Sequence, residues 1–114
     1  MKFYSYAGCS TCRKALAWLA ERGIAAEPID ITREPPSLEE LTLALAQLGR
    51  QRLFNTSGQS YRALGRAAVA AMDDDQALAA LAADGRLIKR PVLITDQQQV
   101  LTGFKPNEWQ ALLG

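Results

Sequence analysis

The sequence predicts an α/β fold with the element order β-α-β, then a block of helices, then β-β-α. Strand-like segments occur near both ends of the 114-residue chain, and helical patterns occupy its middle. A helical crossover makes the first two strands parallel, and a three-residue turn makes the last two antiparallel. We therefore expect a four-stranded mixed sheet within a single domain that covers residues 1–114.

The first half begins with a strand over about residues 2–6 and a helix over about residues 11–21. Gly23 is expected to end this helix. Residues 24–31 predict a second strand, and Pro28 within it suits an edge of the sheet better than its centre. The helix face expected to be buried consists of Cys12, Ala15, Leu16, Leu19 and Ala20.

Residues of about 37–86 predict a helical insertion. A capping box at Ser37 starts a helix that ends at Gly49. Residues 60–71 predict one or two short helices, and Asp73 caps another that reaches about residue 85. These helices need the sheet to cover their apolar faces, so they form no separate domain. The apolar stripe expected on the first of them is Leu38, Leu41, Leu45 and Leu48.

The remaining residues predict two strands and a helix. The segment 87–95 leads into a third strand that starts near Pro91, and residues 97–99 form a turn. Residues 100–102 are the fourth strand. Pro106 stands in the first turn of a final helix, where backbone N–H groups have no partner within the helix and proline's missing N–H costs no hydrogen bond. The apolar side chains of that helix are Trp109, Leu112 and Leu113.

Cys9 and Cys12 are the only two cysteines, and they sit where the first strand gives way to the first helix. Free backbone N–H groups and the helix dipole at this point favour thiolate over thiol. Residues three apart share a helix face, so the sulfurs can approach within disulfide distance. Arg13 and Lys14 add positive charge. The pattern predicts a redox motif of the thioredoxin type, with Cys9 the more exposed and more acidic thiol.

Other interpretations of the pair are weaker. Half a zinc site would need carboxylates or a second subunit, because the chain has no histidine and no further cysteine, and no metal is expected. A structural disulfide this short would constrain little of the unfolded chain. Two inert core thiols are the remaining alternative, because free cysteine packs well in a core.

Composition narrows the classes of function. Thirteen basic and twelve acidic residues give a net charge of +1, which provides no electrostatic footprint for nucleic acid or an anionic membrane. The sequence shows neither an apolar run near 18 residues nor a signal peptide, so a soluble, cytoplasmic protein is expected. In that reducing compartment a Cys-x-x-Cys pair is better suited to turnover than to permanent cross-linking.

A second constellation lies near the other end of the chain. Arg90-Pro91 directly precedes the third strand, where a cis or a trans proline is equally compatible with the sequence. Arg62 and Arg90 could hold a tetrahedral oxyanion through their planar donor forks, or could be solvated surface charges. Lys105 is a further donor, before the last helix.

Four motifs, spread in order along the chain, resemble one family. The chain is similar to the ArsC/Spx family, the arsenate-reductase-like branch of the thioredoxin superfamily, and to its small YusI/YffB-type members. The motifs are Cys-Ser-Thr-Cys-Arg-Lys-Ala (9–15), Phe-Asn-Thr-Ser-Gly-Gln-Ser-Tyr-Arg-Ala-Leu-Gly (54–65), Leu-Ile-Lys-Arg-Pro-Val-Leu (87–93) and Gly-Phe-Lys-Pro (103–106).

This resemblance implies a thioredoxin-like fold and roles for particular residues. Cys9 corresponds to the cysteine that attacks arsenate, and Cys12 to the second thiol found in Spx-like members. Arg62 corresponds to the first anion-binding arginine, and Arg90 to the arginine before a cis proline. Lys105 falls near the third arginine, and lysine keeps the charge but loses the bidentate fork. Arg13 and Pro91 are expected to be structural residues near the site.

The resemblance implies a cytosolic thiol-dependent reductase that uses the Cys-x-x-Cys pair on arsenate, another small oxyanion or an oxidised thiol. No bound cofactor is expected; an external donor, glutathione with glutaredoxin or else thioredoxin, would restore the thiols. The alternative is an Spx-like redox-sensing regulator that binds RNA polymerase, and a third candidate is a glutathione-linked thiol protein. Neither direct nucleic-acid binding nor membrane association is expected.

Overall fold

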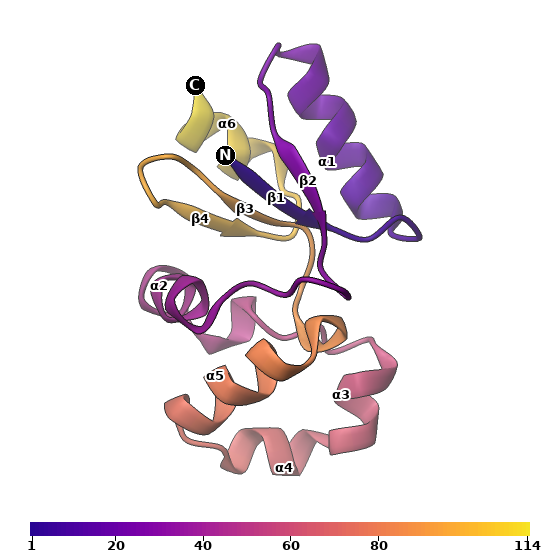
Figure 1. The fold of residues 1–114 in the computed structure, drawn as a ribbon, viewed down its shortest axis with the longest axis vertical. Helices are drawn as coiled ribbons and strands as arrows, with labels where there is room; N and C mark the ends of the chain where they lie inside the picture. The colour runs from indigo at the N-terminus through magenta and orange to yellow at the C-terminus, as the bar shows by residue number, and fades with distance from the viewer.

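A computed structural model describes all residues, 1–114 (Figure 1). It contains the predicted order of elements, with a four-stranded sheet and six α-helices. No helix is both long enough and apolar enough to cross a membrane. The elements are β1 (Lys2–Ser5), α1 (Ser10–Glu21), β2 (Glu27–Asp30), α2 (Leu38–Leu48), the 3-10 turn η1 (Arg50–Arg52), α3 (Gln59–Leu64), α4 (Arg66–Ala71), α5 (Asp74–Ala83), the 3-10 turn η2 (Gly85–Leu87), β3 (Val92–Ile94), β4 (Val100–Thr102) and α6 (Pro106–Leu113).

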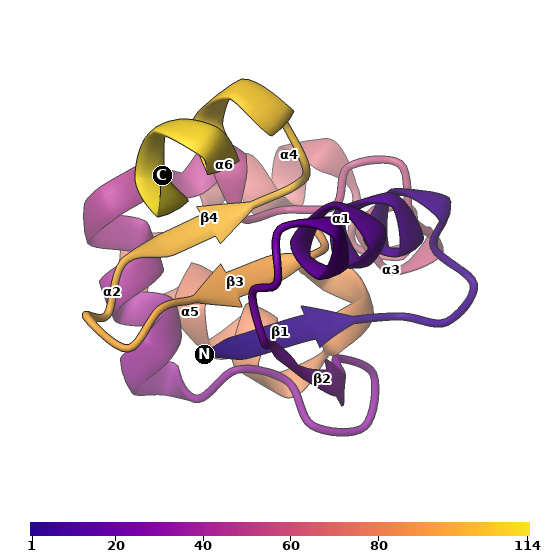
Figure 2. The ribbon, with the colours of Figure 1, turned by 90° about the horizontal axis from the view of Figure 1, so that it is seen from above.

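The strands lie in the order β2-β1-β3-β4, as Figure 2 shows from above. β1 and β2 are parallel, whereas β3 is antiparallel to both β1 and β4, which confirms the expected mixed sheet. β2 is an edge strand, so Pro28 removes no hydrogen bond from the sheet interior. β2 is shorter than the predicted strand 24–31. The register pairs Glu27 with Lys2, where β1 starts, so residues 24–26 have no strand beside them.

Alternate residues of the strands face two separate apolar layers. Phe3 lies on one side of the sheet and Tyr4 on the other, as the two-residue period of a strand requires. Figure 1 shows α1 and α6 over one face and α2 to α5 below the other. The layer under α1 and α6 contains Phe3, Ala15, Leu19, Leu93, Leu101 and Trp109; the opposite layer includes Tyr4, Leu41, Leu81, Val92, Ile94 and Val100.

The predicted apolar stripes were partly wrong. Leu16 and Ala20 are exposed, because α1 contacts the sheet through Cys12, Ala15 and Leu19, at spacings of three and four. On α2, Leu41 and Ala44 are the buried residues. Leu38 is 55% exposed. Leu45 and Leu48, which complete the predicted stripe, are half-buried.

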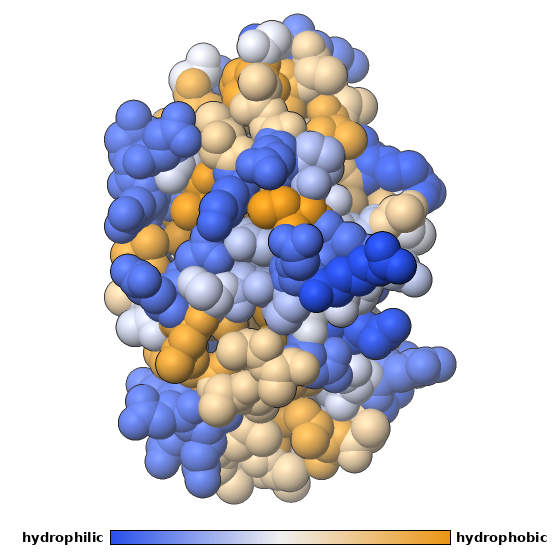
Figure 3. All heavy atoms as spheres, in the orientation of Figure 1, coloured by the Kyte–Doolittle hydropathy of each residue, from blue (hydrophilic) through white to orange (hydrophobic).

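The insertion begins at a capping box, as predicted, and ends in close contact with the sheet. Ser37 and Glu40 cap α2 reciprocally, and Asp73 and Gln76 cap α5 in the same way. Gly85 then packs so closely on the end of β2 that a Cβ atom there would lie 1.8 Å from the carbonyl oxygen of Ile31. Figure 3 shows pale apolar atoms over the α4 and α5 end and hydrophilic side chains between it and the sheet.

Glu40 also ties α2 to β1. Its carboxylate accepts hydrogen bonds from the Tyr4 hydroxyl at 2.8 Å and from the Lys2 ammonium at 3.1 Å. Partial burial acts to raise the pKa of Glu40, but the Ser37 N–H, the Tyr4 hydroxyl and Lys2 outweigh it and hold that pKa below its usual value. Glu40 is therefore a charged junction between the sheet and the insertion.

We predict that Gly85→Ala lowers the free energy of unfolding by about 1–3 kcal/mol, because the added methyl group must displace backbone rather than a flexible side chain. Urea unfolding measures the change. Gly8→Ala is the control, since its added Cβ would meet only the ring edge of Tyr6, an exposed side chain, at 2.9 Å. Equal stability of the two variants would contradict the close contact at η2.

We predict that Glu40→Gln costs about 1–2 kcal/mol of unfolding free energy at neutral pH. The folded-state pKa of Glu40 is lowered, so its stabilisation is present above the unfolded-state pKa of about 4.3 and is lost as pH falls through the folded value. The difference from wild type, measured by urea unfolding at several pH values, should vanish in acid. Glu39→Gln, at an exposed neighbour on α2, should show no such difference.

Candidate functional site

The loops that carry the cysteines and the predicted cations meet at one end of the sheet. β1 runs towards this end and β3 away from it, because the two are antiparallel. β4 is antiparallel to β3 and therefore also ends there. The start of α1, the segment before β3 and the turn between β4 and α6 are thus brought together, although they are up to about 90 residues apart in sequence.

Cys9 is the N-cap residue of α1. Its extended backbone places the sulfur against the first turn of the helix, where the N–H of Cys12 donates to Cys9 Sγ at 3.2 Å. The backbone of Cys9 is also fixed to the preceding loop, because its N–H donates to the Tyr6 carbonyl at 3.0 Å. Both cysteines are free thiols; Cys12 is buried and Cys9 is half-exposed, which confirms the predicted difference in exposure.

The pKa values of the two thiols are shifted in opposite directions. Partial burial acts to raise the pKa of Cys9, but the Cys12 thiol, the Cys12 N–H and Arg90 outweigh it, so the pKa of Cys9 lies below its ordinary value. Burial raises the pKa of Cys12 to about 12, and hydrogen bonding to the negative Cys9 sulfur acts in the same direction. One thiolate, at Cys9, is therefore stabilised by a neighbour that stays protonated.

Arg90 reaches Cys9 from the segment before β3. Its guanidinium lines the same hollow as the Cys9 sulfur and contributes to the lowered pKa of that thiol. Its guanidinium carbon lies 5.0 Å from the ring centroid of Tyr6, a cation–π contact that limits where the side chain can point. The Arg90-Pro91 peptide bond is cis, which decides between the two isomers that the sequence left open. Pro91 in turn accepts a hydrogen bond from the N–H of Gly103 at 2.9 Å.

Cys9 opens into a hollow of about 360 Å³, the cysteine hollow. Three cationic side chains line it, Lys89, Arg90 and Lys105, and no carboxylate does. None of the three lies within 4.0 Å of an Asp or Glu oxygen. Unpaired positive charge beside a thiolate favours an anionic or electron-rich ligand. The remaining lining residues are Thr11, Asn55, Ser57, Thr102, Gly103 and Phe104.

Lys89 is a site residue that the sequence analysis missed. Gly103 explains how it fits: φ is +67° there, and a Cβ would lie 3.1 Å from Lys89 Cε. The lysine stem therefore passes over a turn without a side chain. The signal available in the sequence was the pair of adjacent cations before Pro91, of which only Arg90 was singled out. Asn55 and Ser57 were missed as well, although they stand in the motif 54–65 that carries the family resemblance.

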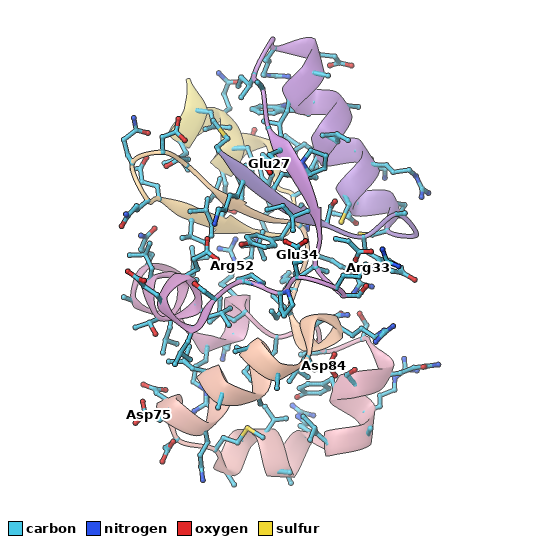
Figure 4. The ribbon with its side chains drawn as sticks, in the orientation of Figure 1. Glu27, Arg33, Glu34, Arg52, Asp75 and Asp84 are labelled. Carbon is cyan, nitrogen blue, oxygen red and sulfur yellow. The ribbon has the colours of Figure 1, made fainter.

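A partly buried ion pair supports the wall of this hollow. Both oxygens of Glu108, in the first turn of α6, accept from the Arg52 guanidinium, at 2.8 and 3.1 Å. Arg52 also donates to the carbonyl of Thr102 at 3.2 Å, and Figure 4 shows it between the sheet and α2. Arg52 holds the pKa of Glu108 below its usual value. Glu108 is thereby engaged by Arg52 and forms no ion pair with Lys105.

The other predicted residues occupy different positions. Arg13 donates to the carbonyl of Ala7 at 2.8 Å and so fixes the loop that precedes Cys9. Arg62 is exposed on α3 and does not line the cysteine hollow. The structure thus brings Arg90 and Lys105 to Cys9 but leaves Arg62 apart from them; its role in anion binding stays a prediction.

Other parts of the structure contain fewer potentially reactive side chains than the cysteine hollow. A larger hollow than the cysteine hollow, about 1120 Å³, lies at the opposite end of the sheet, around the start of β1 and the end of β3, and no cysteine lines it. No group of three or more His, Cys, Asp or Glu side chains has a geometry suited to a metal ion. The reactive groups are concentrated around Cys9.

Comparison with known proteins places this arrangement in a family. A model of the ArsC family matches residues 4–112. The chain is 43% identical to the uncharacterized protein YusI of Bacillus subtilis over 113 residues, covering 96% of this chain and 95% of that protein. It is 28% identical to the global transcriptional regulator Spx of Enterococcus faecalis, covering 99% and 86%. A solved structure from Streptococcus mutans, described as a possible arsenate reductase, is 38% identical with a TM-score of 0.86 and 96% of each chain covered.

We predict that an alkylating reagent modifies Cys9 before Cys12, and does so in mildly acidic solution where an ordinary thiol reacts slowly. Arg90→Leu should shift the pH dependence of Cys9 modification to higher pH, because a positive charge that lowers the pKa of Cys9 is lost. Peptide mapping by mass spectrometry measures both rates. Arg66→Leu, at an exposed arginine of α4, is the matched control and should leave the profile unchanged. Faster labelling of Cys12 would remove Cys9 as the attacking thiol.

Proposed function

The chain belongs to the ArsC family, and on that premise we propose that it is a thiol-dependent reductase whose attacking group is Cys9. The proposal depends on one observation. A cysteine with a lowered pKa caps a helix and faces a hollow that is lined by three cations and no carboxylate. Its neighbour Cys12 donates its backbone N–H to the Cys9 sulfur and has a thiol with a raised pKa.

The reaction that this geometry supports has two steps. The Cys9 thiolate attacks one sulfur of a disulfide, forms a mixed disulfide and releases the first thiolate product, which takes up a proton. Cys12 then loses its proton and attacks Cys9 Sγ, which releases the second thiol and leaves a Cys9–Cys12 disulfide. Two electrons pass from the protein to the substrate. The negative charge on Cys9 that raises the pKa of Cys12 is gone in the mixed disulfide, so Cys12 becomes easier to ionise at the step where it acts.

The charges of the hollow bear on the substrate. Arsenate binding in this family, by resemblance, uses three arginines, but only Arg90 of the corresponding residues is a guanidinium within the hollow. Lys105 supplies charge without a fork, and Arg62 lies outside. An oxidised thiol is therefore the favoured substrate, and a small oxyanion such as arsenate the second. An external thiol donor, glutathione with glutaredoxin or else thioredoxin, would regenerate the pair in a reducing cytoplasm.

The similarity to Spx supports a second function, a redox-responsive regulator that binds RNA polymerase. The same Cys9–Cys12 pair would then act as a switch instead of turning over. The two functions differ in one measurable respect: a reductase cycles repeatedly with excess substrate and donor, whereas a switch stops after a single oxidation.

We predict that Cys12→Ser traps the mixed disulfide at Cys9 and that Cys9→Ser abolishes reaction, since only Cys9 has a stabilised thiolate. Mass spectrometry after addition of a disulfide detects the trapped adduct. Wild type should instead accumulate the internal disulfide and, with glutathione and glutaredoxin or with thioredoxin, consume many equivalents of substrate.

Arsenate is tested in the same assay as a separate substrate. Turnover of arsenate with no turnover of disulfides would reverse the proposed order of substrates. A single oxidation with neither donor restoring the thiols would contradict the reductase and favour the regulator.

A further inference from the structure

A second hollow, of about 180 Å³, adjoins the cysteine hollow and shares two of its lining residues, Asn55 and Arg90. We call it the Arg86 hollow, because Arg86 of η2 is the cation that only this hollow contains. Its other lining residues are Tyr6, Thr32, Gly58, Gln59 and Ser60. Asn55 and Arg90 therefore stand on the boundary between the two hollows, and we call the pair of hollows the groove.

The charges of this groove are arranged along its length. Lys89 and Lys105 line only the cysteine hollow, Arg90 lines both hollows, and Arg86 lines only the Arg86 hollow. None of the four has an Asp or Glu oxygen within 4.0 Å. Asp84 is close in sequence, but its carboxylate accepts from the backbone N–H of Arg86 at 3.0 Å and does not line the groove.

The size of the groove argues against a single inorganic anion as its natural ligand. The two volumes together fall within the about 300–1,000 Å³ that is usual for small-molecule sites, and a tetrahedral oxyanion would occupy only the part next to Arg90. Cations at both ends then have no function in binding such an ion. A longer molecule with negative groups on either side of its reacting sulfur would use all of them.

We infer that the groove binds a small disulfide whose two halves each carry carboxylates, with Lys89 and Lys105 holding one half and Arg86 the other. This inference rests on the proposed function, since Cys9 must attack the disulfide. The bond that breaks is the substrate S–S bond, the bond that forms joins Cys9 Sγ to one half, and the other half leaves as a thiolate. The cations also offset the repulsion between an anionic disulfide and the Cys9 thiolate, and so raise the rate of attack.

The test compares three disulfides of different charge with the reduced protein: oxidised glutathione (anionic), hydroxyethyl disulfide (neutral) and cystamine (cationic). The rate constant for oxidation of Cys9 is measured for wild type, Arg86→Gln and Lys89→Gln/Lys105→Gln. The control is Arg66→Gln, which removes from α4, outside the groove, the same single charge that Arg86→Gln removes. Each variant rate is divided by the wild-type rate for the same disulfide, which cancels differences in leaving-group reactivity.

We predict that Arg86→Gln slows oxidised glutathione about 3–10-fold, leaves hydroxyethyl disulfide unchanged and does not slow cystamine, with the effect shrinking as salt is added. The double lysine variant should behave in the same way, and Arg66→Gln should change none of the rates.

Equal slowing of all three disulfides, or no slowing of oxidised glutathione, would overturn the anionic groove while leaving the reductase intact, because Cys9 would still react. Failure of every disulfide to oxidise Cys9 in wild type would overturn the proposed function, and this inference with it.

Discussion

The hydrogen bond from the Cys12 N–H to Cys9 Sγ, at the first turn of α1, is the interaction on which the candidate site depends. It makes one sulfur the cap of a helix, so the thiolate meets a backbone donor that the helix leaves free. The same turn brings the buried Cys12 thiol against that sulfur, which lowers the pKa of one cysteine and raises that of the other. An asymmetric pair, with one attacking and one resolving thiol, follows from this local geometry.

The sheet brings cationic side chains to the helix terminus, where the helix itself provides only backbone donors. Because β1, β3 and β4 alternate in direction where they pair, Arg90 and Lys105 arrive at the end of the sheet where α1 begins. The insertion is held against this frame by contacts that allow little displacement: Gly85 against Ile31, and Arg52 against Glu108 and Thr102. The packing that stabilises the fold therefore also fixes the distance between the thiolate and its cations.

Much of this could be predicted from sequence because the deciding signals are local. The capping box at Ser37, the short turn at residues 97–99 and the Cys-x-x-Cys before a helix each act within a few residues, and the element order they predict is confirmed. The errors have longer-range causes. Leu16 and Leu38 are exposed because the orientation of each helix on the sheet, and not its apolar content, decides which residues are buried.

The composition of the groove could be predicted only in part, for the same reason. Lys89 lines it because Gly103, fourteen residues later, offers no side chain. Arg86 belongs to it because the Arg86 hollow and the cysteine hollow have Asn55 and Arg90 in common. Neither relation leaves a pattern in the sequence. Arg62 shows the reverse case: the motif that contains it carries the resemblance, whereas the side chain itself lies outside the cysteine hollow.

The central claim, that Cys12 and the helix terminus hold Cys9 as a thiolate, is tested most directly by titrating the ultraviolet absorbance of thiolate in the reduced protein and in Cys12→Ala. Wild type should show one group titrating below the ordinary thiol pKa of about 8.5, assigned to Cys9 by its loss in Cys9→Ser. In Cys12→Ala that titration should move to higher pH, because the thiol donor is gone while the backbone N–H remains. A titration at the ordinary value in wild type, unmoved by Cys12→Ala, would contradict the account.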